Sequence, residues 1–231
     1  MINKVEEVYP QDQWIKDFRL LENDECFLPK IDKYEEALAV LSDKSWRLIE
    51  IKTIESFKQN IKRRGKQAFS NHLNEALAYM FLKDFGFEKI EFIQENNNKK
   101  SPDIEFYEDD IKYYCEVKTI GESEQQLNIY ENNETNDDGM YEYLGKPFFN
   151  KLKATINKAV EQIPSKSKKN IVFIVMRFDD FTNMYYKNYK TQILEFLDTN
   201  YPDISVHIRS GIFERLSINH GILPNKSINS D

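Results

Sequence analysis

Asp103, Glu116 and Lys118 are the residues of this chain whose types and spacing are best suited to chemistry. Asp103 follows Pro102, and twelve residues separate it from the triplet Glu116-Val117-Lys118. Two neighbouring carboxylates repel each other unless a cation lies between them, and their hard oxygen atoms suit Mg²⁺ or Mn²⁺. Such an ion lowers the pKa of a bound water, and a nearby lysine orients that water, helps to deprotonate it or stabilises a developing oxyanion. The three residues therefore point to hydrolysis of phosphodiester bonds.

The stretch Ser101–Gly121 must bring these three side chains together, and its pattern predicts a β-hairpin that turns at Glu108-Asp109-Asp110. Side chains alternate between the two faces of a strand, so Glu116 and Lys118 project side by side. Asp103 has the opposite phase to two expected core residues, Ile104 and Phe106. The start of the first strand of an antiparallel hairpin lies near the end of the second strand, so we expect Asp103 to lie close to Glu116 and Lys118.

The elements around the hairpin predict an α/β fold. An apolar stripe predicts a helix that ends at Gly86, and the first 60 residues read as mainly helical. A run with apolar residues on both faces, Asn170–Phe178, fits a central buried strand. The remaining predicted elements are a strand at Lys89–Glu95, a helix at Lys146–Pro164, a helix at Tyr189–Pro202 and a strand at Asp203–Ser210. Helices on both faces of such a mixed sheet would form one sandwich.

This arrangement resembles the PD-(D/E)xK signature of the restriction-endonuclease-like nuclease superfamily, whose members often carry a glutamate on the helix before the sheet, as Glu75 would be. The resemblance implies a restriction-endonuclease-like α/β/α sandwich with a mixed central sheet and an N-terminal helical extension. It also implies that Asp103, Glu116 and Glu75 hold Mg²⁺ or Mn²⁺ and take part in catalysis, and that Lys118 assists the water. The domain boundaries that follow are 1–60 for the extension, 61–215 for the nuclease-like domain and 216–231 for a tail that frays.

Each of these residues also has a plainer interpretation. Asp103 after Pro102 is a common turn acid, and Glu116 with Lys118 is a common solvated pair on one strand. Glu75 is equally a surface glutamate, and His72, one turn away, is expected to be structural. Two other functions stay open: a nuclease fold that binds nucleic acid or protein without cutting, and an interaction protein that docks through the acidic segment Gly121–Gly145.

The charge distribution favours nucleic acid more than the net charge of −7 does. Ser56–His72 contains five basic residues and no acid, and Lys146–Asn170 contains seven lysines and one acid. Between them, Glu105–Glu142 contains twelve acids. Basic segments that flank an acidic metal site suit a grip on the phosphate backbone. The predicted partner is DNA in preference to RNA, cut as an endonuclease would cut it, with a homodimer as an option. The predicted phosphate contacts are Lys62, Arg63, Arg64, Lys66, Lys146, Lys151 and Lys153.

Composition excludes several other classes. Hydrophobic residues make up 40% of the 231 residues and aromatic residues 13%, which supports a packed core. Two cysteines, Cys26 and Cys115, cannot build a disulfide framework. No apolar run approaches the roughly 18 residues that a bilayer crossing needs, and the N-terminal stretch lacks the apolar run of a signal peptide. We therefore expect a cytoplasmic protein with no membrane partner.

Overall fold

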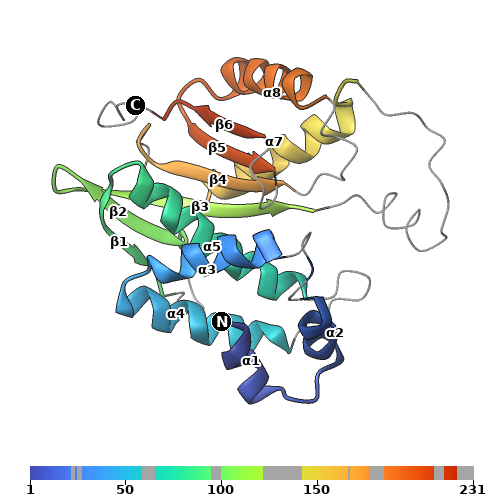
Figure 1. The fold of residues 1–231 in the computed structure, drawn as a ribbon. Helices are drawn as coiled ribbons and strands as arrows, with labels where there is room; N and C mark the ends of the chain where they lie inside the picture. The colour runs from blue at the N-terminus through green and yellow to red at the C-terminus, as the bar shows by residue number, and fades with distance from the viewer. Residues whose placement is uncertain are drawn as a thin grey trace, which may run out of the picture. The chain divides into compact units, whose positions relative to one another are not determined.

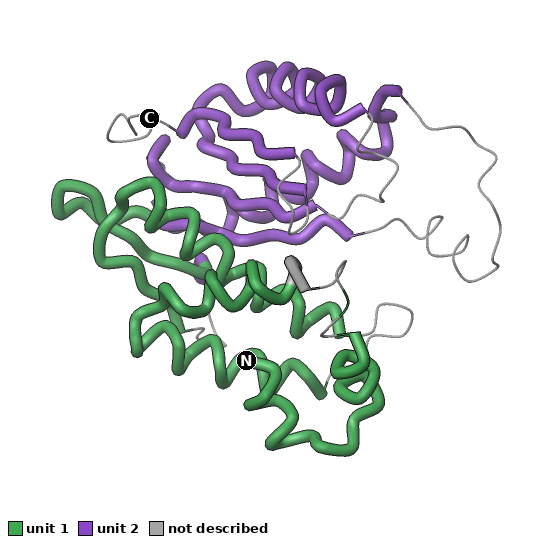
Figure 2. Tube along the Cα trace, in the orientation of Figure 1, with its two compact units in different colours: residues 1–99, 103–113, 224–231 green, residues 100–102, 114–223 purple. Residues whose placement is uncertain are grey.

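The chain divides into two compact units (Figure 2). The computed structural model describes residues 1–21, 24, 28–58, 66–94, 100–121, 142–165, 167–176, 185–210 and 216–222. Unit 1 comprises Met1–Lys99, Asp103–Tyr113 and Pro224–Asp231, and unit 2 comprises Lys100–Pro102 and Tyr114–Leu223. Asp103 and Glu75 therefore belong to unit 1, whereas Glu116 and Lys118 belong to unit 2.

Helices occupy most of unit 1, as the sequence predicts (Figure 1). Ser42 caps the fourth helix, because its side chain accepts a hydrogen bond from the Ser45 amide at 3.2 Å. The fifth helix is buried from Leu73 to Leu82 and gives way to Gly86, whose φ of 85° suits glycine. The bounds are α1 Ile2–Val8, α2 Gln13–Leu21, α3 Leu28–Ala39, α4 Asp43–Phe57 and α5 Gln67–Asp84.

Six strands form one mixed sheet in the order β1-β2-β3-β4-β5-β6. The β1–β2 and β5–β6 pairs are antiparallel, and the β3–β4 and β4–β5 pairs are parallel. The bounds are β1 Glu88–Phe92, β2 Ile104–Glu108, β3 Ile111–Ile120, β4 Ile171–Met176, β5 Ser205–Ser210 and β6 Ser217–His220. The predicted α/β class and the predicted order of elements are both confirmed.

The predicted hairpin is formed by β2 and β3. Its turn consists of Asp109 and Asp110, whose φ angles of 49° and 62° are both positive. Two consecutive positive φ angles match a type I′ turn, in which aspartate is one of the tolerated residues. Ile104 and Phe106 are fully buried on β2, so the predicted core face of this strand is confirmed.

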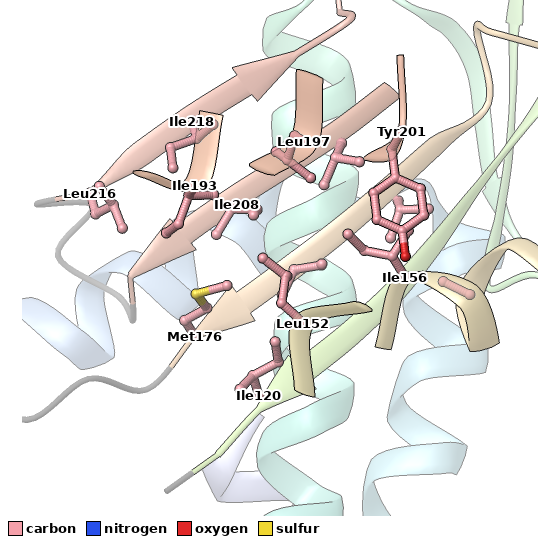
Figure 3. Packing of buried hydrophobic residues seen from close by; sticks show 14 residues of the cluster. Ile120, Leu152, Ile156, Met176, Ile193, Leu197, Tyr201, Ile208, Leu216 and Ile218 are labelled. Atoms are coloured by element: carbon pink, nitrogen blue, oxygen red, sulfur yellow. The ribbon is translucent and has the colours of Figure 1, made fainter. Parts of the chain in front are cut away.

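One face of the unit 2 sheet packs against two helices, α7 Lys146–Val160 and α8 Tyr186–Asn200. Leu152 and Ile156 from α7 and Ile193 from α8 lie in one buried cluster with Ile208 of β5 (Figure 3). All six residues of β4 are buried, which confirms the central strand that the sequence predicts. Gly145 is the N-cap of α7, and Pro147 stands in its first turn.

The strand β6 differs from the sequence prediction, which places residues 216–231 in a fraying tail. Four residues are too few to show a clear alternation, and two of them are Ser217 and Asn219. Ile218 and His220 are nevertheless buried, and β5 supplies the pairing partner. Among the helices in the described part of the chain, none combines the length and the apolar character that a bilayer crossing needs.

Candidate functional site

Glu116 is a fully buried acid in the middle of β3. It pairs in register with Val172 of β4, and Lys118 pairs with Ile174. Paired residues of neighbouring strands point to the same face of a sheet. Because Val172 and Ile174 belong to the cluster under α7 and α8, Glu116 and Lys118 face those helices. The interpretation of Glu116 as half of a solvated strand pair is therefore wrong.

Lys118 is the immediate partner of Glu116, as strand alternation predicts. Its Nζ forms an ion pair with Glu116 Oε1, and it also donates a hydrogen bond to Gln162 Oε1 at 2.8 Å. The side chain of Lys118 is 25% exposed, whereas that of Glu116 is 0% exposed. A fully buried carboxylate is thus paired with a lysine whose side chain is partly exposed to solvent.

Gln162 is a member of the site that sequence reasoning missed. It lies just after the end of α7, and its side chain is half-buried. Its amide oxygen faces Lys118, and its Nε2 donates to the Ser101 carbonyl at 3.4 Å. A glutamine after an amphipathic helix carries no sequence signal of its own, so only the fold could identify it.

Asp103 lies in a bend directly before β2. The Ile93 amide donates to the Asp103 backbone carbonyl at 2.9 Å, and Asp103 is half-buried. Each of the two carboxylates of the motif is thus placed in its own unit. Their convergence on one point stays a prediction.

Glu75 is also buried, on α5 of unit 1, where it is 6% exposed. Its Oε1 lies 2.7 Å from His72 Nδ1, and its Oε2 lies 3.5 Å from Lys52 Nζ. The interpretation of Glu75 as a surface glutamate is therefore wrong. Within unit 1 both of its oxygens face basic groups, and its role as a metal ligand stays a prediction.

The predicted phosphate contacts fall into three groups. Lys62, Arg63 and Arg64 lie outside the described residues. Lys66 is buried at 8% exposure, and its Nζ lies 2.8 Å from Asp12 Oδ2 and 2.9 Å from the Phe57 carbonyl oxygen. This geometry holds its ammonium inside unit 1 and does not present it to a phosphate.

The remaining basic residues lie on α7, where Lys146, Lys151 and Lys153 are all exposed. The Nζ of Lys151 donates to the Gly121 carbonyl at 2.7 Å. Most of the acidic segment between Gly121 and Gly145, residues 122–141, lies outside the described residues.

Within the part of the chain that the structure describes, no three or more His, Cys, Asp or Glu side chains form a group suited to a metal ion. Comparisons of the chain with models of protein families, with curated proteins and with solved structures found no match.

Proposed function

We propose that this protein is a metal-dependent nuclease that cuts DNA in preference to RNA, as an endonuclease, through Asp103, Glu116 and Lys118. One observation carries the proposal: a fully buried glutamate is ion-paired with a lysine two residues further along the same strand, and a glutamine amide holds that lysine from a second element.

This pair is poorly explained by stability alone. Removing two charges from water costs more than their attraction returns in many proteins, and apolar residues of similar size are often neutral or better. Glu116 stands next to apolar strand neighbours, Cys115 and Val117, and opposite Val172. A charged pair kept in such surroundings is a candidate for function, because active sites are where burial and charge partners are combined.

Chain connectivity supports a place for Asp103 near this pair. The Ser101 carbonyl accepts a hydrogen bond from Gln162, whose oxygen accepts one from Lys118. Successive Cα atoms are about 3.8 Å apart, so the Cα of Asp103 lies at most about 8 Å from that of Ser101. We therefore expect the Asp103 carboxylate to share a site with Glu116.

The donor atoms of this set fit Mg²⁺ or Mn²⁺. Magnesium is commonly held by one or two carboxylates, with water and phosphate oxygens completing its coordination. Asp103 and Glu116 would hold the ion, with Glu75 contributing through water. The metal would share the Glu116 carboxylate with the Lys118 ammonium, since a carboxylate has about four lone-pair positions. When bound, the ion would lower the pKa of a water molecule and neutralise charge on the phosphate.

Lys118 would act directly on the reacting phosphate. An ammonium has three N–H donors, and two of them face Glu116 and Gln162. The third is the one that we propose donates to the attacking water or to a phosphate oxygen. A donor that is already oriented before the substrate arrives stabilises developing charge without a further reorganisation cost.

The exposed lysines of α7 would hold the DNA backbone. Lys146 and Lys153 are exposed on the helix whose other face packs on the sheet next to Glu116. The element order α5-β1-β2-β3-α7-β4-α8-β5 is also the order that the resemblance to PD-(D/E)xK nucleases implies. These two features support DNA as the substrate and the nuclease fold as its frame.

The experiment that tests the proposal is incubation of the purified protein with supercoiled DNA, linear duplex, single-stranded DNA and RNA. Each substrate is tested with Mg²⁺, Mn²⁺ or EDTA, and Glu116→Gln is the control for contaminating nuclease. We expect nicked and linear products from supercoiled DNA with either metal, and none with EDTA or the variant. Binding of DNA without cleavage under every metal would contradict the proposal and favour a non-cutting DNA-binding module.

A further inference from the structure

We infer that Gln162 is a positioning residue of the proposed active site, which fixes the Lys118 ammonium relative to the chain segment that leads into Asp103. The inference rests on the proposed function and adds to it a residue outside the Asp-Glu-Lys motif.

The direction of the Gln162 amide is determined by its two neighbours. Lysine has no acceptor, so the group 2.8 Å from Lys118 Nζ must be the amide oxygen. The amide nitrogen then faces the Ser101 carbonyl, which can only accept, at 3.4 Å. The flipped amide would place its donor against the Lys118 ammonium and its acceptor against the Ser101 carbonyl. The same side chain thus joins β3 to the segment before β2.

The backbone of Gln162 is also held by a hydrogen bond. Its amide donates to the Ala159 carbonyl at 3.0 Å, in the turn that ends α7. Next to it, Glu161 forms a 3.2 Å ion pair with Lys100, which is one residue before Ser101. Two consecutive residues after α7 therefore contact two consecutive residues before Pro102.

The two hydrogen bonds restrict the position of the Lys118 ammonium. A lysine carries its charge on a flexible four-carbon stem and has no preferred direction of its own. Glu116 fixes the ammonium from the same strand, and Gln162 fixes it from the turn after α7. A misplacement of about 1 Å at a reacting group can reduce the rate by on the order of 10²-fold. Gln162 would thereby raise turnover without touching the DNA.

The test compares Gln162→Met, which keeps the length of the side chain but removes both hydrogen bonds, with Gln192→Met as the matched control. Gln192 lies on α8 in the same unit, and its oxygen accepts a hydrogen bond from the Leu144 amide at 2.9 Å and not from Lys118. We expect Gln162→Met to lower kcat by on the order of 10–100-fold. The KM for DNA should stay within about twofold, because only the reacting geometry is affected. Mn²⁺ affinity measured by calorimetry should be unchanged, and Gln192→Met should keep normal kcat.

A second variant, Gln162→Glu, covers the case in which Gln162→Met does not fold. It keeps the acceptor for Lys118, loses the donor to Ser101 and adds a negative charge beside the ammonium, so we expect a smaller fall in kcat because Lys118 stays held. Normal kcat in a folded Gln162→Met protein, or in Gln162→Glu when the first variant is unfolded, would overturn this inference alone. A large rise in KM instead of a fall in kcat would overturn it too. Absence of cleavage by the unaltered protein would overturn the proposed function and this inference together.

Discussion

Glu116 in unit 2 and Glu75 in unit 1 are two buried acids with basic partners, and they differ in how those partners are arranged. Glu75 lies on a helix between His72 and Lys52, with one basic group facing each oxygen. Glu116 lies on a strand and pairs with Lys118, whose ammonium also contacts the neutral amide of Gln162. The Lys118 side chain is 25% exposed and that of Lys52 is 15% exposed. Burial of an acid therefore does not by itself identify a site. A partner that is both held in place and partly exposed to solvent is the stronger indication.

The largest expected difference between the two acids is in cleavage. Glu116→Gln removes the charge that would hold the metal, so we expect a loss of at least about 10³-fold in the single-turnover rate of plasmid cleavage. Glu75→Gln should reduce the same rate by only about tenfold, because in this account Glu75 reaches the ion through water. Equal losses for both variants would remove the distinction between the two acids.

The two lysines should differ next. Lys118→Ala should lower cleavage by on the order of 10²–10⁴-fold, the usual scale for losing a group that stabilises charge or moves a proton. Its Mn²⁺ affinity, followed by calorimetry, should hold or rise slightly, because a positive charge has left the site. Lys52→Ala is the matched control and should stay within about threefold of the normal rate. Normal cleavage by Lys118→Ala would contradict the mechanism.

His207 in unit 2 should make the free energy of unfolding depend on pH. It is buried on β5, its ring stacks on Phe173, and its Nδ1 lies 2.5 Å from Asn219 Oδ1. Burial lowers the pKa of His207 from 6.5 to about 4, although the Asn219 bond opposes this. Between about pH 6.5 and pH 4, His207 is protonated in the unfolded chain but neutral in the folded chain. The free energy of unfolding therefore falls as the pH falls through this range.

The expected loss of unfolding free energy over that range is about 3 kcal/mol, at 1.36 kcal/mol per pKa unit. Urea denaturation at a series of pH values would measure it, with His207→Gln as the reference that cannot titrate. The difference between the two proteins should be constant above pH 7 and below pH 4 and should change between them. Parallel pH profiles of the two proteins would show that folding does not lower the pKa of His207.

The Glu75→Gln variant should lose more stability than the Glu116→Gln variant, which is the reverse of the order expected for activity. Glu75→Gln leaves Lys52 and His72 without their common partner in a buried position, so we expect the free energy of unfolding to fall by about 2 kcal/mol. Glu116→Gln relieves a fully buried charge, and Lys118 keeps Gln162 as a partner. Its stability should therefore be unchanged or raised by up to about 1 kcal/mol. Urea denaturation at pH 7.5 would measure both, and a large loss for Glu116→Gln would reassign that residue to the core.

The smallest expected effect concerns the lysines of α7. Changing Lys146 and Lys153 to alanine should weaken DNA binding by a similar factor for every sequence and reduce the slope of log K against log salt by about 2. Lys4→Ala is the control, because Lys4 is exposed in unit 1 and paired with Glu7. An unchanged slope would mean that other residues contact the phosphates.

The sequence predicts the elements of this fold better than it predicts their polar contacts. Strand alternation was sufficient to place Glu116 beside Lys118, and the unbroken apolar run of β4 was sufficient to identify a central strand. The burial of Glu116 depends on α7, which follows β3 only after a long connection, so periodicity within the strand could not reveal it. Gln162 and Lys52 were missed for the same reason, since each contacts a partner that is distant in the sequence. The strand β6 was missed because four residues are too few to show an alternation, although its partner β5 is close in the sequence.

The central claim is that Asp103 and Glu116 hold the same metal ion, and a double-mutant cycle tests it most directly. Mn²⁺ affinity would be measured by calorimetry for the unaltered protein, Asp103→Asn, Glu116→Gln and the double variant. If both carboxylates bind one ion, the two losses in binding free energy are not additive, and we expect a coupling of about 1 kcal/mol or more. Additive losses, or a loss from Glu116→Gln alone, would contradict the shared site and with it the proposed nuclease mechanism.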